Sequence, residues 1–222
     1  MPNWCENRMT VSGSKEAVAK FVDMAKSDKD ALSFAKFVPE EWDNPAYQDA
    51  STSSCEQLEP NPNFNWYRWR LDNWGVKWDC SDATVDVEGG DEDTVATFSF
   101  TTPWGSPDKF YKKIATMFPE LSFECYGYEG GCDYWYHFEG YNGEPVGEET
   151  QGIWNQEKVK EAIVEQLQEL DIDPDTIDLD KLREKLWIGI DEECDISQYP
   201  QANFVVENDP DEIVAKCEEC KK

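Results

Sequence analysis

The sequence has little positive charge and almost no histidine. Its 222 residues include 20 Lys and Arg against 48 Asp and Glu, which gives a formal charge of −28, and the single histidine is His137. Binding to a phosphate backbone depends on Lys and Arg that release condensed counterions, so we expect no direct binding of DNA or RNA. An anionic membrane surface repels the chain for the same reason.

The sequence also lacks long apolar runs and nucleotide-binding loops. No stretch approaches the 18 or so apolar residues that span a bilayer. Glu6 and Arg8 interrupt the region where a secretory signal needs a continuous apolar segment. We therefore expect a soluble, cytoplasmic protein of a bacterial host cell. Neither GxxxxGK[ST] nor GxGxxG occurs, which excludes nucleotide sites of those two kinds.

The eight cysteines do not form a disulfide or zinc pattern. A chain of this length without an export signal does not need disulfides, so we expect free thiols. Only Cys217 and Cys220 form a CxxC, which offers two ligands where a structural zinc needs four. We interpret them as an exposed pair in an acidic tail, and we expect no metal and no cofactor.

What is present points to a folded α+β domain. Aromatic residues make up 14% of the chain, far more than in a disordered acidic sequence. Hydrophobic periodicity predicts a strand, a helix, a hairpin, a second helix and further strands. In chain order these cover residues 4–11, 15–25, 84–87 with 94–101, 107–118, 121–126 and 134–138. This order is typical of the ferredoxin-like split βαβ sandwich, an antiparallel sheet with two helices.

Two segments interrupt this pattern. Residues 39–65 are rich in Pro, Asn, Ser and Asp, which predicts a long surface loop inserted in the domain. The following segment, 66–80, contains four tryptophans, Trp66, Trp69, Trp74 and Trp78. For Trp74, Gly75, Lys77 and Trp78 we favour a structural role, with Gly75 allowing a tight turn between two buried indoles.

Four motifs resemble a known family. They are MPNWCENRMTVSG, WRLDNWGVKWD, FSFTTPWGSPDKFY and FPELSFECYGYEGG. In this order they are similar to the ferredoxin-like-domain family of small phage- and plasmid-encoded proteins, sometimes called YubB-type, over residues 1–145. Trp104–Pro107 reads WGSP where such proteins commonly have a WSPP-like run. The resemblance implies a ferredoxin-like fold and a mobile-element setting, and it implies no biochemical activity.

The pattern changes near residue 148, so we expect a domain over 1–147 and an acidic helical extension over 148–222. Apolar residues recur at helical spacing around 159–170 and 179–187, which predicts two helices. The acidic segment between them, 171–180, resembles the start of a calcium loop, but Thr176 and Leu182 stand where an EF-hand requires Gly and Glu. We interpret its aspartates as helix caps.

The distribution of charge is the most informative feature. Eight acids and no base lie between Lys77 and Lys109, and nine acids and no base lie between Lys113 and Lys158. Uncompensated rows of carboxylates imitate DNA and attract basic nucleic-acid-binding grooves. We therefore expect a non-enzymatic accessory protein that binds and inhibits a host or defence protein of this kind, by DNA mimicry of an anti-restriction or anti-CRISPR type. The expected contacts are Asp91, Glu92, Asp93, Glu144, Glu148, Glu149, Asp191, Glu192 and Glu193.

Three alternatives stay open. The acidic surface could serve solubility alone. A metal-binding or enzymatic module could be built on His137, on the 171–180 loop or on Cys217 and Cys220, although a strand histidine between aromatic residues is more often a packing residue. A passive structural role could use the exposed edge of a four-stranded sheet, which would also allow a homo-oligomer.

Overall fold

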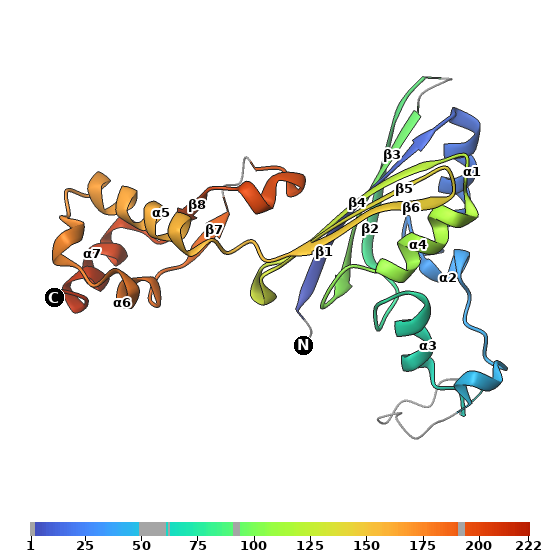
Figure 1. Ribbon diagram of the computed structural model, residues 1–222, viewed down its shortest axis with the longest axis horizontal. Coiled ribbons are helices and arrows are strands. Elements are labelled where there is room, and N and C mark those ends of the chain that lie inside the picture. Colours follow the sequence, from blue (N-terminus) through green and yellow to red (C-terminus); the bar gives the residue numbers. More distant parts are fainter. Residues whose placement is uncertain (1–2, 49–60, 62, 91–93, 191–193) are drawn as a thin grey trace. The chain divides into compact units, whose positions relative to one another are not determined.

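The chain divides into two compact units, Met1–Gln151 and Gly152–Lys222. The computed structural model describes residues 3–48, 61, 63–90, 94–190 and 194–222 (Figure 1). Six of the expected contacts lie outside the described residues, namely Asp91, Glu92, Asp93, Asp191, Glu192 and Glu193. The domain boundary that we expected between residues 147 and 148 falls inside a strand, so the division comes a few residues later.

The first unit is α+β, with one antiparallel six-stranded sheet in the order β2-β3-β1-β4-β5-β6. The strands are β1 (Trp4–Gly13), β2 (Ser81–Gly89), β3 (Thr94–Pro103), β4 (Ser122–Glu129), β5 (Tyr134–Tyr141) and β6 (Glu144–Gln151). The expected four-stranded sheet is therefore too small, because β5 and β6 extend it beyond β4. Its edges are β2 and β6.

Helices cover one face of this sheet (Figure 1). The helices that contact the strands are α1 (Lys15–Ala25) and α4 (Asp108–Met117), while α2 (Phe34–Phe37) packs against α1 and α3 (Trp66–Asn73) packs against α4. Alternate residues of β1 point toward them and are buried, from Cys5 to Val11, as the period of two in a strand requires. Phe21 of α1 lies at the centre of the core. Its ring packs against the rings of Phe37, Phe98, Phe118 and Phe123 at centroid distances of 4.8–5.9 Å.

The tryptophan-rich segment is part of the core, as predicted. Trp66, Trp69 and Trp74 are at most 4% exposed. The indole nitrogen of Trp74 donates a hydrogen bond of 2.9 Å to the carbonyl oxygen of Val38. Gly75 has φ +88°, a left-handed conformation that glycine adopts without strain and that ends α3 in a tight turn. The segment therefore stabilises the fold.

The amino-terminal and WGSP motifs meet in a buried polar network. The side-chain amide of Asn7 donates hydrogen bonds to Thr102 Oγ1 at 2.7 Å and to the carbonyl oxygen of Cys5 at 2.9 Å. The Tyr111 hydroxyl donates to Asn7 Oδ1 at 3.4 Å. Because every member of this network is buried and bonded, these motif residues fix the strands relative to α4.

The second unit is not only helical, which corrects our expectation. It contains α5 (Gln156–Glu169), α6 (Leu179–Arg183), α7 (Pro210–Glu219) and an antiparallel pair, β7 (Ile188–Ile190) and β8 (Phe204–Val206). The apolar stripe of α5 is buried, as its spacing predicts. In the acidic segment, Asp173 and Asp178 accept hydrogen bonds from backbone N–H groups at helix starts, so the capping interpretation is confirmed.

Cys217 and Cys220 belong to the core of this unit, with exposures of 3% and 0%. The expectation of an exposed tail pair was wrong, because α7 packs its apolar face inward with Cys217, and Cys220 directly follows this helix as its C-cap. Within the described part of the chain, no helix is long and apolar enough to cross a membrane.

Candidate functional site

Charge is segregated between the two layers of the first unit. The six strands carry ten acidic side chains and one base, Arg8. The other described bases of this unit lie on the helices and loops that cover the opposite side. The sheet is therefore the acidic layer of the first unit.

Most of these acids project from the face that the helices of the first unit leave uncovered, which we call the helix-free face. Strand register places Glu124 directly opposite Glu139, and it places Glu149 opposite His137. Glu6 of β1 and Asp86 of β2 lie on the same face and are exposed. Because neighbouring strands are about 4.8 Å apart, this face holds several carboxylates at short separations.

The three expected contacts on β6 do not share one environment. Glu144 and Glu149 are exposed, and Glu149 belongs to the helix-free face. Glu148 points to the opposite face, where it pairs with Lys112 of α4 at 2.7 Å and accepts a hydrogen bond from Tyr136 at 3.1 Å. Burial raises the pKa of the Glu148 carboxyl, but these bonds outweigh it and hold the pKa below its usual value. Glu148 is nevertheless exposed, so its role as a partner contact stays a prediction.

Glu124, His137 and Glu139 form a compact cluster on the helix-free face. His137 Nε2 lies 3.7 Å from Glu139 Oε1 and 4.0 Å from Glu124 Oε1. One potential ligand atom from each residue lies within 4.8 Å of the other two, and no other such group of three or more occurs among the described residues. His137 was a candidate in the sequence, whereas its two carboxylate neighbours were not identified.

Aromatic side chains hold this cluster in place. The ring of Tyr126 stacks on the imidazole of His137, with a centroid distance of 4.5 Å and an interplanar angle of 9°. The Tyr126 hydroxyl donates a hydrogen bond of 2.7 Å to Glu124 Oε1. Burial and this bond to a carboxylate raise the pKa of Tyr126, so its hydroxyl remains a donor. The guanidinium of Arg8 lies over the Tyr126 ring, 5.4 Å from its centroid.

A shallow hollow of about 340 Å³ adjoins the cluster. Glu124 and Glu139 are part of its lining, together with Thr10, Tyr141 and Val146. Water or a small ligand therefore has room beside the two carboxylates. The hollow is open to solvent, so it does not enclose a larger molecule.

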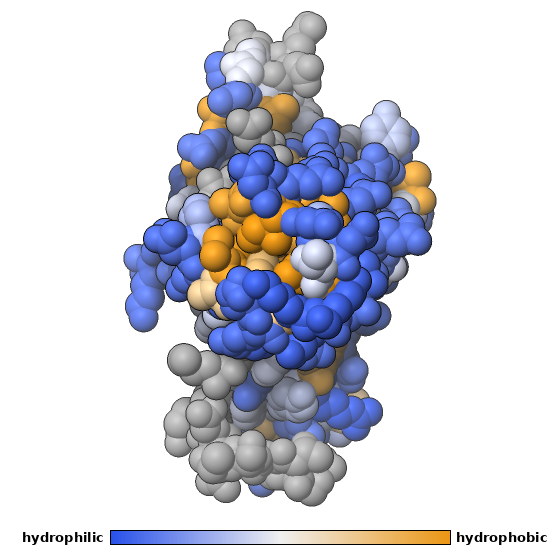
Figure 2. Space-filling view, turned by 90° about the vertical axis from the view of Figure 1, so that its left-hand side faces the viewer, coloured by the Kyte–Doolittle hydropathy of each residue, from blue (hydrophilic) through white to orange (hydrophobic). Residues whose placement is uncertain are grey.

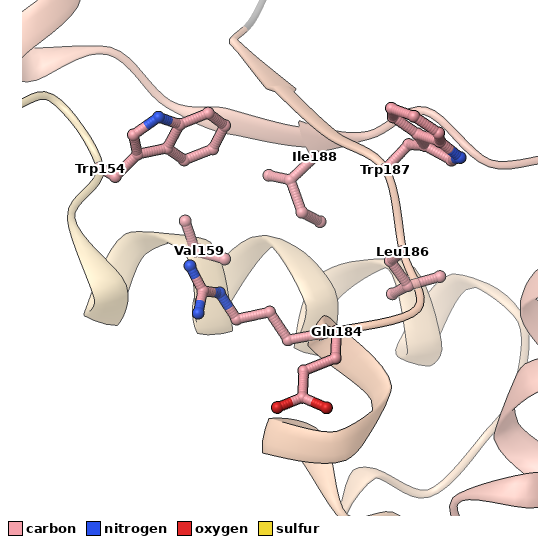
Figure 3. Close-up of a pocket in the computed structure, with 7 residues that line it drawn as sticks. Trp154, Val159, Glu184, Leu186, Trp187 and Ile188 are labelled. Carbon is pink, nitrogen blue, oxygen red and sulfur yellow. The ribbon is translucent and has the colours of Figure 1, made fainter. Parts of the chain in front are cut away.

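The second unit has an open pocket of its own, with a volume of about 430 Å³ (Figure 3). Trp154 and Trp187 stand at its two ends, with Val159 and Ile188 between them. The Trp187 side chain is 73% exposed, and Arg183 and Glu184 are the charged residues of the lining. The pocket is open to solvent, and the carboxylate of Glu184 points away from the two indoles (Figure 3).

The buried thiols do not provide a nucleophile. Burial raises the pKa of the Cys5 thiol to about 12, and it raises the pKa of Cys125 and Cys217 as well. A thiol with a raised pKa is not ionised near neutral pH and is a poor nucleophile. These cysteines are therefore packing residues.

The face drawn in Figure 2 is mostly hydrophilic, with a hydrophobic patch near its middle. The helix-free face of the first unit is distinguished instead by its carboxylates.

Comparisons with known proteins give only a distant structural match. No family model matches the sequence, and no curated protein matches it. The chain is similar to the crystal structure of protein api92 from Yersinia pseudotuberculosis, of the family DUF1281, with a TM-score of 0.46 and 8% sequence identity. The match covers 68% of this chain and 99% of that chain. Similarity at this level supports no conclusion about function.

Proposed function

We propose that this protein is a non-enzymatic, acidic accessory protein that binds a nucleic-acid-binding protein and occupies its basic groove. The observation that carries the proposal is the separation of charge, since the sheet strands hold ten acids and only Arg8 as a base. The helix-free face is the proposed contact surface. Its carboxylates would take the place of phosphates in the groove, and inhibition would follow from exclusion of DNA or RNA.

Electrostatics supports this mode of binding. A net charge of −28 repels nucleic acid and attracts a positively charged groove over a distance of about one Debye length, roughly 10 Å at moderate salt. Such steering speeds the encounter of the two proteins and weakens as salt is added. Binding by the helix-free face should therefore depend strongly on ionic strength.

We also propose that four strands of the sheet and two helices form a ferredoxin-like unit. The order β2-β3-β1-β4 places β1 between β3 and β4, and helices connect β1 to β2 and β3 to β4. In this description β5 and β6 are an added hairpin. The ferredoxin-like strand order and the resemblance of residues 1–145 to phage- and plasmid-encoded proteins together favour a mobile-element protein. We propose that such a protein acts on a bacterial defence enzyme.

The strand edges favour a partner other than a second copy of the chain. The edge strand β2 carries Asp82, Asp86 and Glu88, and the edge strand β6 carries Glu144 and Pro145. Like charges along both edges disfavour edge-to-edge pairing of identical chains, and proline cannot donate to a ladder. A homo-oligomer through these edges is therefore the weaker candidate.

The test is an affinity pull-down of the tagged protein from its host cell, at low and moderate salt, with bound proteins identified by mass spectrometry. One variant neutralises the helix-free face through Glu6→Gln, Asp86→Asn and Glu149→Gln. A control variant removes three exposed acids elsewhere in the same unit, through Glu16→Gln, Asp43→Asn and Glu120→Gln.

The proposal expects a nucleic-acid-binding protein that is retained at low salt, is displaced by double-stranded DNA, and is lost with the face variant but kept with the control. If the face variant and the control variant retained the partner equally, its binding would depend on net charge alone and not on the helix-free face. Absence of any basic partner would leave the acidic surface as a solubility feature.

A further inference from the structure

His137 has an unsatisfied ring nitrogen that faces two carboxylates. Its Nε2 atom is buried and has no hydrogen-bond partner in the described part of the chain. The separations from Glu139 and Glu124, 3.7 and 4.0 Å, exceed the length of a hydrogen bond. A buried polar atom without a partner costs free energy, and native structures usually explain such an atom by a bound water or ion.

We propose that Glu124, His137 and Glu139 bind one divalent transition-metal ion, for which Zn²⁺ is the suitable probe. Imidazole nitrogen and carboxylate oxygen are both zinc ligands, with bonds of about 2.0–2.2 Å. At tetrahedral angles such bonds separate two ligand atoms by about 3.3 Å. The observed separations of 3.7 and 4.0 Å are slightly larger, and the half-exposed glutamate side chains can move to close the difference.

Regular pairing of β4 with β5 brings the three proposed ligands together. His137 and Glu139 are two residues apart on β5 and therefore share a face, and Glu124 of β4 is the direct cross-strand partner of Glu139. The Tyr126 hydroxyl bond orients Glu124, as outer-shell hydrogen bonds do in metal sites. The neighbouring hollow leaves room for water to complete the coordination.

The ligand set also selects the class of metal. Ca²⁺ and Mg²⁺ prefer oxygen ligands alone, whereas imidazole favours Zn²⁺ and other first-row transition metals. Two carboxylates balance the charge of a divalent ion, which suits a neutral imidazole as the third ligand. The competing explanation is a protonated His137 that forms ion pairs with both glutamates and binds no metal.

The test uses the full chain and adds Zn²⁺ in the presence of excess Mg²⁺, which occupies weak, nonspecific carboxylate sites. Calorimetry measures affinity and stoichiometry, and NMR follows the imidazole signals, which need no assignment because the sequence has one histidine. The variants are His137→Gln, Glu124→Gln and Glu139→Gln. Glu6→Gln is the matched control, since it removes an exposed carboxylate from the same face outside the cluster.

The expected result is one Zn²⁺ per chain, a shift of the His137 imidazole signals, and a loss of affinity of at least about tenfold in each cluster variant, since even outer-shell changes cost 10–100-fold. Glu6→Gln should bind as the natural sequence does. Imidazole signals that do not respond to Zn²⁺, as would occur if thiols held the ion, would overturn the site. So would equal affinities in the glutamate variants and the control. The site does not depend on the proposed protein partner, because its readout is the metal itself.

Discussion

The hydroxyl oxygen of Ser106 fills the space beside Gly127 that a side chain at that position would need. A Cβ on Gly127 would overlap this oxygen and would lie 3.0 Å from Asn7 Oδ1. The glycine therefore allows the WGSP turn to pack directly on β4, next to the Asn7 network. This close approach explains why two motifs that are far apart in the sequence depend on each other.

We predict that Gly127→Ala lowers the free energy of unfolding by about 1–3 kcal/mol, the usual cost of overpacking a core. Gly90→Ala is the control, because no atom lies within 4 Å of the added methyl group. Its effect should stay within about 0.5 kcal/mol. Urea unfolding measures both, and equal midpoints for the two variants would contradict the close packing of Ser106 on Gly127.

Sequence periodicity predicts α1, α4, α5, α6 and the first five strands because these elements have a buried side with a regular spacing, whereas α2, α3 and α7 were not predicted. It does not predict β6, whose sequence EPVGEETQ is exposed along most of its length and shows no alternation of apolar and polar residues. A strand of this kind is determined by its pairing with β5. Without this strand the sequence also does not show that Glu148 and Glu149 lie on opposite faces, as alternation in a strand requires.

The cluster of Glu124, His137 and Glu139 illustrates the same limit. His137 and Glu139 are neighbours in the sequence, and their spacing in a strand was sufficient to place them on one face. Glu124 joins them only through the register of β4 and β5, which depends on the three-residue turn Gly130–Cys132 and Asp133 with φ 51°. Local spacing does not encode such a cross-strand pair.

We predict that Arg70→Met destabilises the first unit by about 3 kcal/mol. The guanidinium lies 4.9 Å from the Trp66 ring centroid and 5.2 Å from that of Trp74, and its Nε donates to Glu40 at 2.7 Å. The Arg70 and Glu40 side chains are only 17% and 13% exposed, so removing one leaves the other charge poorly solvated.

Arg70→Lys should restore less than half of the lost stability. Lysine lacks the planar guanidinium, which stacks on the indoles of Trp66 and Trp74 and pairs with Glu40 at the same time. Arg68→Met on the same helix is the control. Its ion pair with Asp72 is exposed, which limits the expected effect to about 1 kcal/mol. Urea unfolding followed by tryptophan fluorescence compares them, and a full rescue by lysine would argue against a role for stacking.

We predict that Leu182→Ala destabilises the second unit by about 2–5 kcal/mol. Leu182 of α6 is fully buried in the core of that unit, where its loss leaves a cavity. Val214→Ala is the control, since Val214 is 43% exposed. In calorimetry, Leu182→Ala should move the transition of the second unit and leave that of the first in place. A common shift of the whole unfolding curve would show that the two units unfold together.

We predict that the ion pair between Glu148 and Lys112 makes the stability of the first unit depend on pH. Burial raises the pKa of Glu148, but its bonds with Lys112 and Tyr136 bring it below the unfolded value of about 4.5. A group whose folded pKa is depressed stabilises the protein above its unfolded pKa, and this contribution is lost as the pH falls through the folded pKa.

Glu148→Gln should therefore cost up to about 1 kcal/mol at pH 7, a modest value because both side chains of the pair are about a third exposed. The difference from the natural sequence should shrink as the pH falls below about 4.5, because protonated Glu148 and glutamine are both neutral there. Glu144→Gln on the same strand controls for the general effect of removing a charge from an acidic protein. Urea unfolding at several pH values gives the comparison. A cost for Glu148→Gln that persists unchanged in acid would mean that packing, and not the ion pair with Lys112, is what position 148 contributes.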